Sequence, residues 1–321
     1  MSIWLVGAGS MAQDYAKVLF EIGKPFDVIG RGENSAKIFE QMTGHSVRTG
    51  GLKNALDSDV APHHAIVAVG VEQLASTATE LILAGTRRIL IEKPAGLDYT
   101  EIANLSKIAE KYGTTVLLAY NRRFYRSVVK AHEYIIDDGG VLSAQFEFTE
   151  WSHEIEKLSK GKGVLERWLL GNSSHVIDLV FHFIGKPLEW SCWHSGSLLW
   201  HPDSARFSGA GVSEKNILFS YLADWQAPGR WGIELNTAKH KLIFRPMEKL
   251  QITKIGSVEV EEVSLACELD IKFKPGLYNQ TDSFLNSNDQ AFCSLKEQVE
   301  NVKLYSKIAG YPTSLDNIVG N

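Results

Sequence analysis

The chain has 321 residues, of which 44% are hydrophobic, 10% aromatic and 22% charged. This composition is ordinary for a globular protein, and the length suits two domains with a large core. The formal net charge of -5 excludes the basic surface that proteins use to bind nucleic acid or acidic membranes. No apolar run approaches membrane-spanning length, and the first residues lack the pattern of a signal peptide.

The first motif is an apolar run, Ile3 to Val6, that leads directly into Gly7-Ala8-Gly9-Ser10-Met11-Ala12. Apolar residues at helical spacing follow, so the segment predicts a strand, a glycine turn and a helix, which is the dinucleotide-binding fingerprint. Gly7 permits the tight turn, Gly9 lets a pyrophosphate approach the backbone, and Ala12 lets the helix lie close to the strand. The helix start at Ser10 and Met11 then faces the phosphates. A chance glycine turn is the weaker alternative.

The second predicted strand, 26–29, ends at Gly30 and Arg31. NAD-binding proteins usually place an acidic residue near this point to bind the ribose hydroxyls. Here a small residue leaves room for a 2′-phosphate, and a guanidinium can bind it. The sequence therefore favours NADP, with NAD as the alternative if Arg31 is only solvated and Glu33 binds the ribose.

Strands and helices alternate through the rest of the first half. The predicted helices are 36–42, 74–84 and 99–112, and the predicted strands are 65–69, 88–91 and 115–119. This order indicates a doubly wound parallel sheet, whose ligands bind at the carboxyl ends of the strands. Lys93 and the pair Asn121-Arg122 each follow such an end. We assign residues 1–119 to a dinucleotide-binding domain.

The second half predicts a different kind of sheet. Residues 142–151 alternate between apolar and polar, as a half-buried strand does. Further strand-like runs are 188–193, 217–223, 231–235, 241–244 and 259–265. The whole is predicted to be an α/β protein, with a Rossmann domain followed by an α+β domain over 120–321 that carries a large, mostly antiparallel open sheet. An amphipathic helix is predicted over 289–310.

A helix is also predicted around His175. Asn172 or Ser173 is a natural N-cap, which places His175 in the first turn, where the helix dipole favours a neutral imidazole. Asp178, three residues later, shares its face. Nothing in the sequence adds further metal ligands at a recognisable spacing, so we predict no metal site. The three cysteines are odd in number and far apart, which favours a reducing cytoplasm.

Four landmarks occur in one order along the chain: Gly7 to Ala12, Glu92-Lys93-Pro94, Asn121-Arg122-Arg123-Phe124, and His175 to Asp178. With these residues the chain resembles the glucose–fructose oxidoreductase / inositol dehydrogenase (Gfo/Idh/MocA) family of NAD(P)-dependent oxidoreductases. The resemblance implies that Lys93 polarises the reacting oxygen or carries its proton, and that His175 is the acid/base. It implies that Glu92 orients the cofactor end of the site and that Pro94 follows a cis bond. Substrate contacts are then expected from Asn121, Arg122, Asn172 and Asp178.

Two positions depart from the family pattern. Gly171 stands where many members carry an aspartate, four residues before the histidine, and Leu74 stands near the place of a histidine after the third strand. Either Lys93 and His175 suffice for catalysis, or Asn172 binds the substrate without exchanging a proton.

The leading hypothesis is hydride transfer between NADP(H) and a hydroxyl or carbonyl of a sugar, polyol or nucleotide-linked sugar. A reductase of a non-sugar carbonyl or dihydrodiol is the related alternative, and a non-catalytic regulator that senses the cofactor is the competing class. The arginines 122, 123 and 167 are either anion ligands or solvated. The tryptophans of the second half indicate packing or an interface, and the family resemblance favours a homodimer or homotetramer formed through the second sheet.

Overall fold

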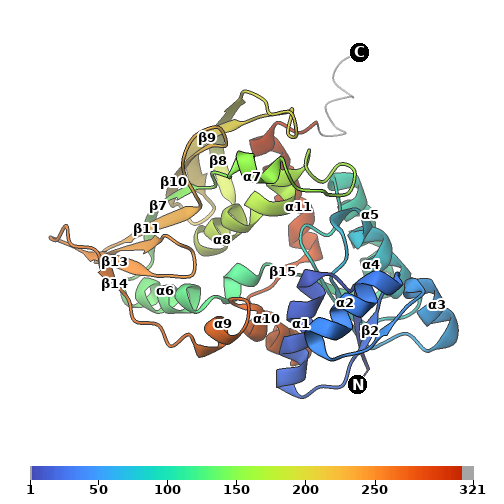
Figure 1. Cartoon of the computed structure of the whole chain (residues 1–321). Helices are drawn as coiled ribbons and strands as arrows, with labels where there is room; N and C mark the ends of the chain where they lie inside the picture. Colours follow the sequence, from blue (N-terminus) through green and yellow to red (C-terminus); the bar gives the residue numbers. More distant parts are fainter. Residues whose placement is uncertain (1, 313–321) are drawn as a thin grey trace, which may run out of the picture. The chain divides into compact units, whose positions relative to one another are not determined.

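The computed structural model describes residues 2–312 of the chain. The described residues form two compact units, 2–121 with 269–300, and 122–268 with 301–312. Figure 1 traces both units along the chain by colour.

The first unit is built on a seven-stranded sheet in the order β15-β6-β5-β4-β1-β2-β3. Its strands are β1 (Ile3–Val6), β2 (Asp27–Ile29), β3 (Val47–Arg48), β4 (His64–Val67), β5 (Arg88–Ile91), β6 (Thr115–Leu118) and β15 (Cys293–Ser294). All neighbours are parallel except β15, which runs antiparallel to β6. The chain order reverses between β1 and β4, and such a switch point forms the ligand crevice of a doubly wound sheet. This confirms the predicted fold of the first half.

Helices connect these strands. They are α1 (Ser10–Ile22), α2 (Glu33–Thr43), α3 (Gly51–Ser58), the 3₁₀ turn η1 (Val71–Gln73), α4 (Leu74–Leu83), α5 (Tyr99–Tyr112) and the 3₁₀ turn η2 (Asn121–Phe124). Local chemistry sets their ends. The Asp98 carboxylate accepts the Glu101 N–H at 2.9 Å to cap α5, and Gly113 closes it in the left-handed conformation.

Residues 269–300 also pack in the first unit, although the sequence analysis placed them in the second domain. This segment contains most of α9 (Glu268–Lys272), α10 (Leu277–Leu285), β15 and the start of α11 (Leu295–Ala309). The Tyr15 hydroxyl in α1 lies 3.3 Å from Gln280 Oε1 in α10, and Arg88 forms an ion pair with Asp289 at 2.7 Å. β15 covers the open edge of β6. These are long-range pairings, which periodicity within a short window does not predict.

The second unit has an eight-stranded sheet in the order β14-β13-β12-β11-β7-β10-β9-β8. Its strands are β7 (Val141–Glu147), β8 (Pro187–Ser195), β9 (Arg206–Ser213), β10 (Leu218–Asp224), β11 (Gly232–Thr237), β12 (His240–Phe244), β13 (Gln251–Lys254) and β14 (Glu261–Glu262). Only β7 and β10 pair in parallel. The predicted large, mostly antiparallel sheet is confirmed.

Four helical segments accompany this sheet: α6 (Arg126–Asp137), α7 (Ser152–Ile155), the π-helical turn η3 (Leu169–Ser173) and α8 (Ser174–Ile184). α8 is apolar on nearly all sides and packs on β7 and β11. The opposite face of the sheet is open. There Trp193, Ser208 and Leu222 lie in register across β8, β9 and β10, and the tryptophan and leucine are about two-thirds exposed.

Two strands of this sheet have no clear sequence signal, and one predicted strand is mostly absent. β9 contains two glycines, which disfavour a strand prediction. A Cβ at Gly209 would lie 2.5 Å from the Tyr221 ring. The glycine is therefore required by a large cross-strand neighbour. β13 is short and carries no clear alternation. Of the predicted strand 259–265, only Glu261 and Glu262 pair.

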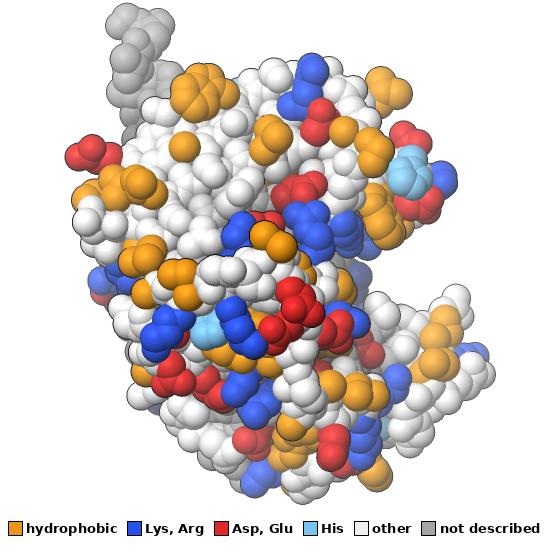
Figure 2. Space-filling view, turned by 90° about the vertical axis from the view of Figure 1, so that its left-hand side faces the viewer, with side chains coloured by type: hydrophobic (Ala, Val, Ile, Leu, Met, Phe, Trp, Pro, Cys, Tyr) orange, Lys and Arg blue, Asp and Glu red, His pale blue; other side chains and the backbone are white. Residues whose placement is uncertain are grey.

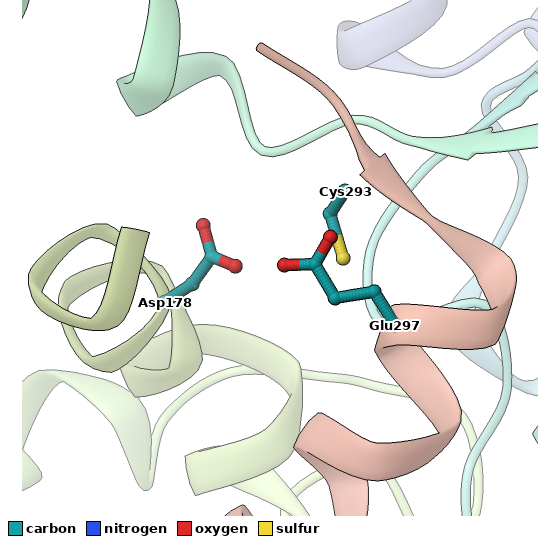
Figure 3. Close-up of side chains that lie close together, drawn as sticks. All are labelled: Asp178, Cys293 and Glu297. Atoms are coloured by element: carbon teal, nitrogen blue, oxygen red, sulfur yellow. The ribbon is translucent and has the colours of Figure 1, made fainter. Parts of the chain in front are cut away.

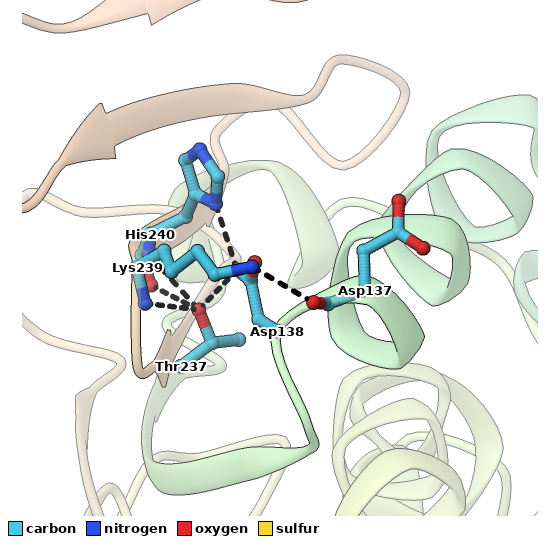
Figure 4. A network of polar contacts seen from close by, with 5 residues as sticks. All are labelled: Asp137, Asp138, Thr237, Lys239 and His240. Atoms are coloured by element: carbon cyan, nitrogen blue, oxygen red, sulfur yellow. Dashed lines mark hydrogen bonds and ion pairs between the residues drawn. The ribbon is translucent and has the colours of Figure 1, made fainter.

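A polar network fixes the hairpin between β11 and β12 to the end of α6 (Figure 4). The buried Asp138 carboxylate accepts hydrogen bonds from Thr237 Oγ1 at 2.6 Å and His240 Nδ1 at 2.7 Å, and Lys239 pairs with it at 3.4 Å. Burial alone would raise the pKa of Asp138, but these donors outweigh it and hold the pKa below its usual value.

On the face shown in Figure 2, Lys and Arg side chains are intermingled with Asp and Glu. The face in view therefore carries no large field of one sign, in agreement with the small net charge of the chain. Among the residues that the structure describes, no helix combines the length and the apolar composition that crossing a membrane requires.

Candidate active site

The glycine turn after β1 has the geometry of a phosphate cradle. Gly7 has φ +127°, and a Cβ there would lie 2.2 Å from the Ala68 carbonyl oxygen at the end of β4. Only glycine allows this approach. A Cβ at Gly9 would meet nothing within 4 Å, so the space in front of this residue is open. Gly9 is also the N-cap of α1 without a side-chain cap, which leaves the first N–H groups of the helix available to an anion.

A cavity of about 1050 Å³ opens at this turn, entirely within the first unit. The predicted residues Gly7, Gly9, Ser10, Met11 and Arg31 all line it. The rest of the lining includes Ser35 in α2, Lys53 in α3, the end of β4 and one face of α4. Ala12 is fully buried behind the turn, where its small side chain lets α1 pack on the sheet. The cavity is large enough for a dinucleotide.

The region around Arg31 differs in part from the expectation. A Cβ at Gly30 would lie 2.7 Å from Val47 Cγ1, so the packing of β3 requires the glycine there. The next residue, Arg31, is exposed and lines the cavity. The Gly51 N–H bonds to the Gly30 carbonyl oxygen at 2.9 Å and brings the start of α3, with Lys53, to the same cavity. Glu33, the alternative ribose ligand, is not among the lining residues.

The segment Glu92-Lys93-Pro94 follows β5, and the Lys93–Pro94 peptide bond is cis, which confirms the expectation. The Tyr15 hydroxyl donates to Glu92 Oε1 at 2.9 Å, which connects this segment to the helix that follows the glycine turn. Burial raises the pKa of Glu92, although Lys93 and Tyr15 act in the opposite direction. Lys93 itself is half-buried.

Gln298 is a further residue of this region, and it was not predicted from the sequence. It is fully buried in α11, and its Nε2 donates to the Pro94 carbonyl oxygen at 3.1 Å. The Tyr120 hydroxyl donates to Gln298 Oε1 at 3.2 Å. The glutamine therefore ties the backbone beside Lys93 to the end of β6. Only its burial in an amphipathic helix could have suggested it.

Cys293 and Glu297 lie one helical turn apart, at β15 and the first turn of α11 (Figure 3). Their ligand atoms lie within 4.8 Å of each other. A structural zinc site takes four ligands, so this pair does not by itself define a metal centre in the described part of the first unit. The third side chain in Figure 3, Asp178, belongs to α8 of the second unit.

In the second unit, His175 lies in the first turn of α8, is 6% exposed, and has its ring centroid 6.3 Å from that of Trp231. Ser173 is at the N-cap position of α8, as predicted, but its side chain does not cap the helix. Ser173 has helical dihedrals and no side-chain cap, because the π-helical turn η3 runs directly into α8. The dipole argument for a neutral His175 therefore does not apply.

Asn172 and Ser173 bind a carboxylate instead. Asn172 Nδ2 and Ser173 Oγ donate to Glu150 Oε1 at 2.9 and 2.7 Å, and Arg230 contacts Glu150 Oε2 at 3.2 Å. Glu150 is 2% exposed. Burial raises its pKa, which these donors partly offset. An acidic residue at the end of an alternating strand was its only sequence signal.

Two predicted substrate ligands have partners inside their own units. Arg123 holds both oxygens of Asp178, from Nε at 2.8 Å and from Nη2 at 2.7 Å, and both side chains are almost fully buried. Asn121 Nδ2 donates to the Pro275 carbonyl oxygen at 2.9 Å. Their contacts with a substrate, like the meeting of Lys93 with His175 from the other unit, stay predictions.

A doubly wound sheet with an open cavity at its glycine turn defines the class of Rossmann-type dinucleotide-binding folds. Residues 1–120 match the GFO_IDH_MocA family, described as an oxidoreductase family with an NAD-binding Rossmann fold. The match covers 120 of the 321 residues and shows the NAD-binding Rossmann fold of this family in that part of the chain. Among curated proteins, none matches the sequence.

Solved structures resemble the whole chain. Levoglucosan dehydrogenase in complex with NADH is 16% identical, with a TM-score of 0.79 over 97% of this chain and 96% of that one. An oxidoreductase from Agrobacterium radiobacter, in complex with NAD⁺, L-tartaric acid and magnesium, is 11% identical, with a TM-score of 0.77 over 97% and 96%. UDP-N-acetylglucosamine 3-dehydrogenase from Acidithiobacillus ferrooxidans is 15% identical, with a TM-score of 0.73 over 97% of each chain. At these identities the likeness shows the fold.

Proposed function

We propose that this protein is an NAD(P)-dependent oxidoreductase that transfers a hydride between a nicotinamide and a hydroxyl or carbonyl of a sugar, polyol or nucleotide-linked sugar. The observation that carries the proposal is that an open phosphate cradle and Lys93, which follows β5, both lie in the first unit. The family match supports it. Two similar structures, by their names, are dehydrogenases of a sugar or a sugar nucleotide.

The roles of the residues follow from their chemistry. The bound nicotinamide supplies or accepts the hydride. Lys93 holds the reacting oxygen and stabilises its developing negative charge, while His175 takes or returns the proton. Glu92 and Gln298 fix the backbone on either side of Lys93 through their bonds to Tyr15 and Pro94. Asn172 binds a substrate hydroxyl without exchanging a proton.

For the cofactor we propose NADP in preference to NAD. Arg31, Ser35 and Lys53 all line the cavity, and two of them are cations. A 2′-phosphate gains charge-assisted hydrogen bonds from such a set, whereas a ribose hydroxyl does not require it. NAD remains the alternative, as the ligand named in two of the similar structures is NAD⁺ or NADH.

We also propose a homodimer or homotetramer in the cytoplasm. The open face of the second sheet supports the assembly, because Trp193, Leu218 and Leu222 are each about two-thirds exposed there.

A turnover assay tests the function. The protein is mixed with NADP⁺ or NAD⁺ and a panel of sugars, polyols and sugar nucleotides, and reduced nicotinamide is followed by absorbance. We expect turnover of at least one class, with a preference for NADP⁺. Turnover of only non-sugar carbonyls or dihydrodiols would favour the related reductase. Tight NADPH binding with no turnover of any compound would favour a cofactor-sensing regulator.

A further inference from the structure

Aromatic rings and guanidinium groups alternate in a stack within the second unit. The Arg230 guanidinium carbon lies 4.8 Å from the Trp151 ring centroid and 4.7 Å from that of Trp231. The Arg122 guanidinium carbon lies 4.6 Å from the Trp231 centroid. His175 packs beside the same tryptophan. Two cations therefore flank one ring next to the proposed acid/base.

Arg122 and Arg123 are neighbours in sequence with opposite surroundings. Arg123 is held by both oxygens of Asp178. Arg122 is stacked on Trp231 and Tyr125, and its buried Nε has no hydrogen-bond partner within residues 2–312. Burial lowers the pKa of Arg122, as expected for a cation that its surroundings do not fully compensate. A buried guanidinium N–H without an acceptor is costly unless a ligand supplies one.

Glu248 and Glu150 act on Arg122 through space, but neither forms an ion pair with it among the described residues. Glu150 is already bound by Asn172, Ser173 and Arg230. Burial also disfavours its negative charge. Arg122 is therefore without a direct carboxylate partner in residues 2–312, whereas Arg230 shares Glu150 with two neutral donors.

We propose that Arg122 and Arg230, clamped on Trp231, form a subsite for an anionic group on the substrate, a carboxylate or a phosphate. The stacked planes leave the guanidinium edges to donate in pairs to two oxygens of one anion, which is the geometry that arginine favours. This inference rests on the proposed function, because it names the substrates of that site as acidic sugars or sugar phosphates in preference to neutral sugars.

Binding to the NADPH-saturated protein tests the subsite. Titration calorimetry compares D-glucose, D-glucuronate and glucose 6-phosphate, which share a ring and differ in their charged group. We expect at least one anion to bind roughly 10- to 100-fold more tightly than glucose, the range for a charge-assisted contact. Tighter binding of glucuronate or of the phosphate ester decides between the two groups.

Substitutions test whether the anion preference depends on Arg122 and Arg230. Arg122→Gln and Arg230→Gln should each reduce anion binding to about the level of glucose, and Arg230 is exposed enough that its loss should leave the fold intact. Arg245→Gln removes the same charge from the open face of the same sheet, where Arg245 pairs with Glu147, and should change nothing. Thermal melting verifies that each variant is folded.

The proposal is overturned if no anion binds more tightly than glucose, or if the preference survives both substitutions. Turnover measurements distinguish failure of the anion subsite from failure of the proposed function. Oxidation of neutral sugars without any anion preference contradicts the anion subsite alone. An anion preference that depends on Arg122, with no turnover of any sugar, contradicts the proposed function alone.

Discussion

Asn172 donates from Nδ2 to Glu150 Oε1 at 2.9 Å, and this bond fixes which way its side-chain amide faces. The amide oxygen is turned away from Glu150, so it is the atom available to accept a hydrogen bond from a substrate hydroxyl. The family pattern has an aspartate beside this position, where this chain has Gly171. A buried carboxylate three residues after β7 thus orients the amide of Asn172, the residue that we propose as the substitute.

Replacing Glu150 should lower activity through Asn172. We expect Glu150→Gln to reduce kcat/KM roughly 10- to 100-fold, because an amide cannot accept from Asn172, Ser173 and Arg230 as a carboxylate does. Glu150→Asp should recover part of the loss. Steady-state kinetics measures both, with Glu147→Gln on the open face as the matched control. If folded Glu150→Gln kept the wild-type kcat/KM, Glu150 would have no role in the site.

Substitution of the two glycines of the turn should affect different properties, stability for Gly7 and cofactor affinity for Gly9. Gly7→Ala should destabilise the protein, because its Cβ would lie 2.2 Å from a backbone oxygen that cannot move freely. Gly9→Ala should melt at nearly the wild-type temperature and still lose NADPH affinity, because its Cβ would occupy only open space. Thermal melting and NADPH fluorescence titration separate the two effects. Full NADPH affinity in Gly9→Ala would place the pyrophosphate elsewhere.

Cofactor preference should depend on Arg31 and Lys53. Each change to Gln should weaken NADPH binding roughly 10-fold and leave NADH binding nearly unchanged, because only NADPH carries the 2′-phosphate. Lys24→Gln, an exposed lysine that does not line the cavity, is the control. Equal losses for the two cofactors would indicate that these cations bind the shared pyrophosphate.

Asp138 should make stability depend on acid pH. Its pKa in the folded protein is below the ordinary value of 3.8, so its contribution is complete above that pH and is lost as the pH falls through the folded pKa. Asp138→Asn should cost about 1–3 kcal/mol at neutral pH, because buried donors lose their acceptor. Urea unfolding from pH 7 downward should show the difference from wild type shrinking only below about pH 4. A pH-independent difference would show that Asp138 acts as an uncharged partner.

The sequence predicts the elements whose signals are local. The helix 99–112 was found with the predicted bounds, because an aspartate cap and a left-handed glycine define its ends. The glycine turn also follows from a short motif, and the cis bond before Pro94 was expected from the family resemblance. β9 was missed because its glycines are explained only by Tyr221 on the neighbouring strand.

The candidate site was predictable only in part, for the same reason. Short sequence motifs contain the glycine turn, Lys93 and His175, so these could be predicted. Glu150 and Gln298 could not, because their hydrogen-bond partners lie far away in the chain. The packing of residues 269–300 with the first unit likewise depends on contacts across most of the sequence.

Lys93 tests the central claim most directly. Hydride transfer in Lys93→Met is compared with wild type by stopped-flow absorbance of the reduced nicotinamide, at saturating cofactor and with a substrate found in the turnover assay. We predict that the rate falls roughly 10²- to 10⁴-fold while NADPH affinity stays within about threefold, because Lys93 acts on the reacting oxygen and not on the phosphates. A variant that binds NADPH normally and transfers hydride at the wild-type rate would contradict the account.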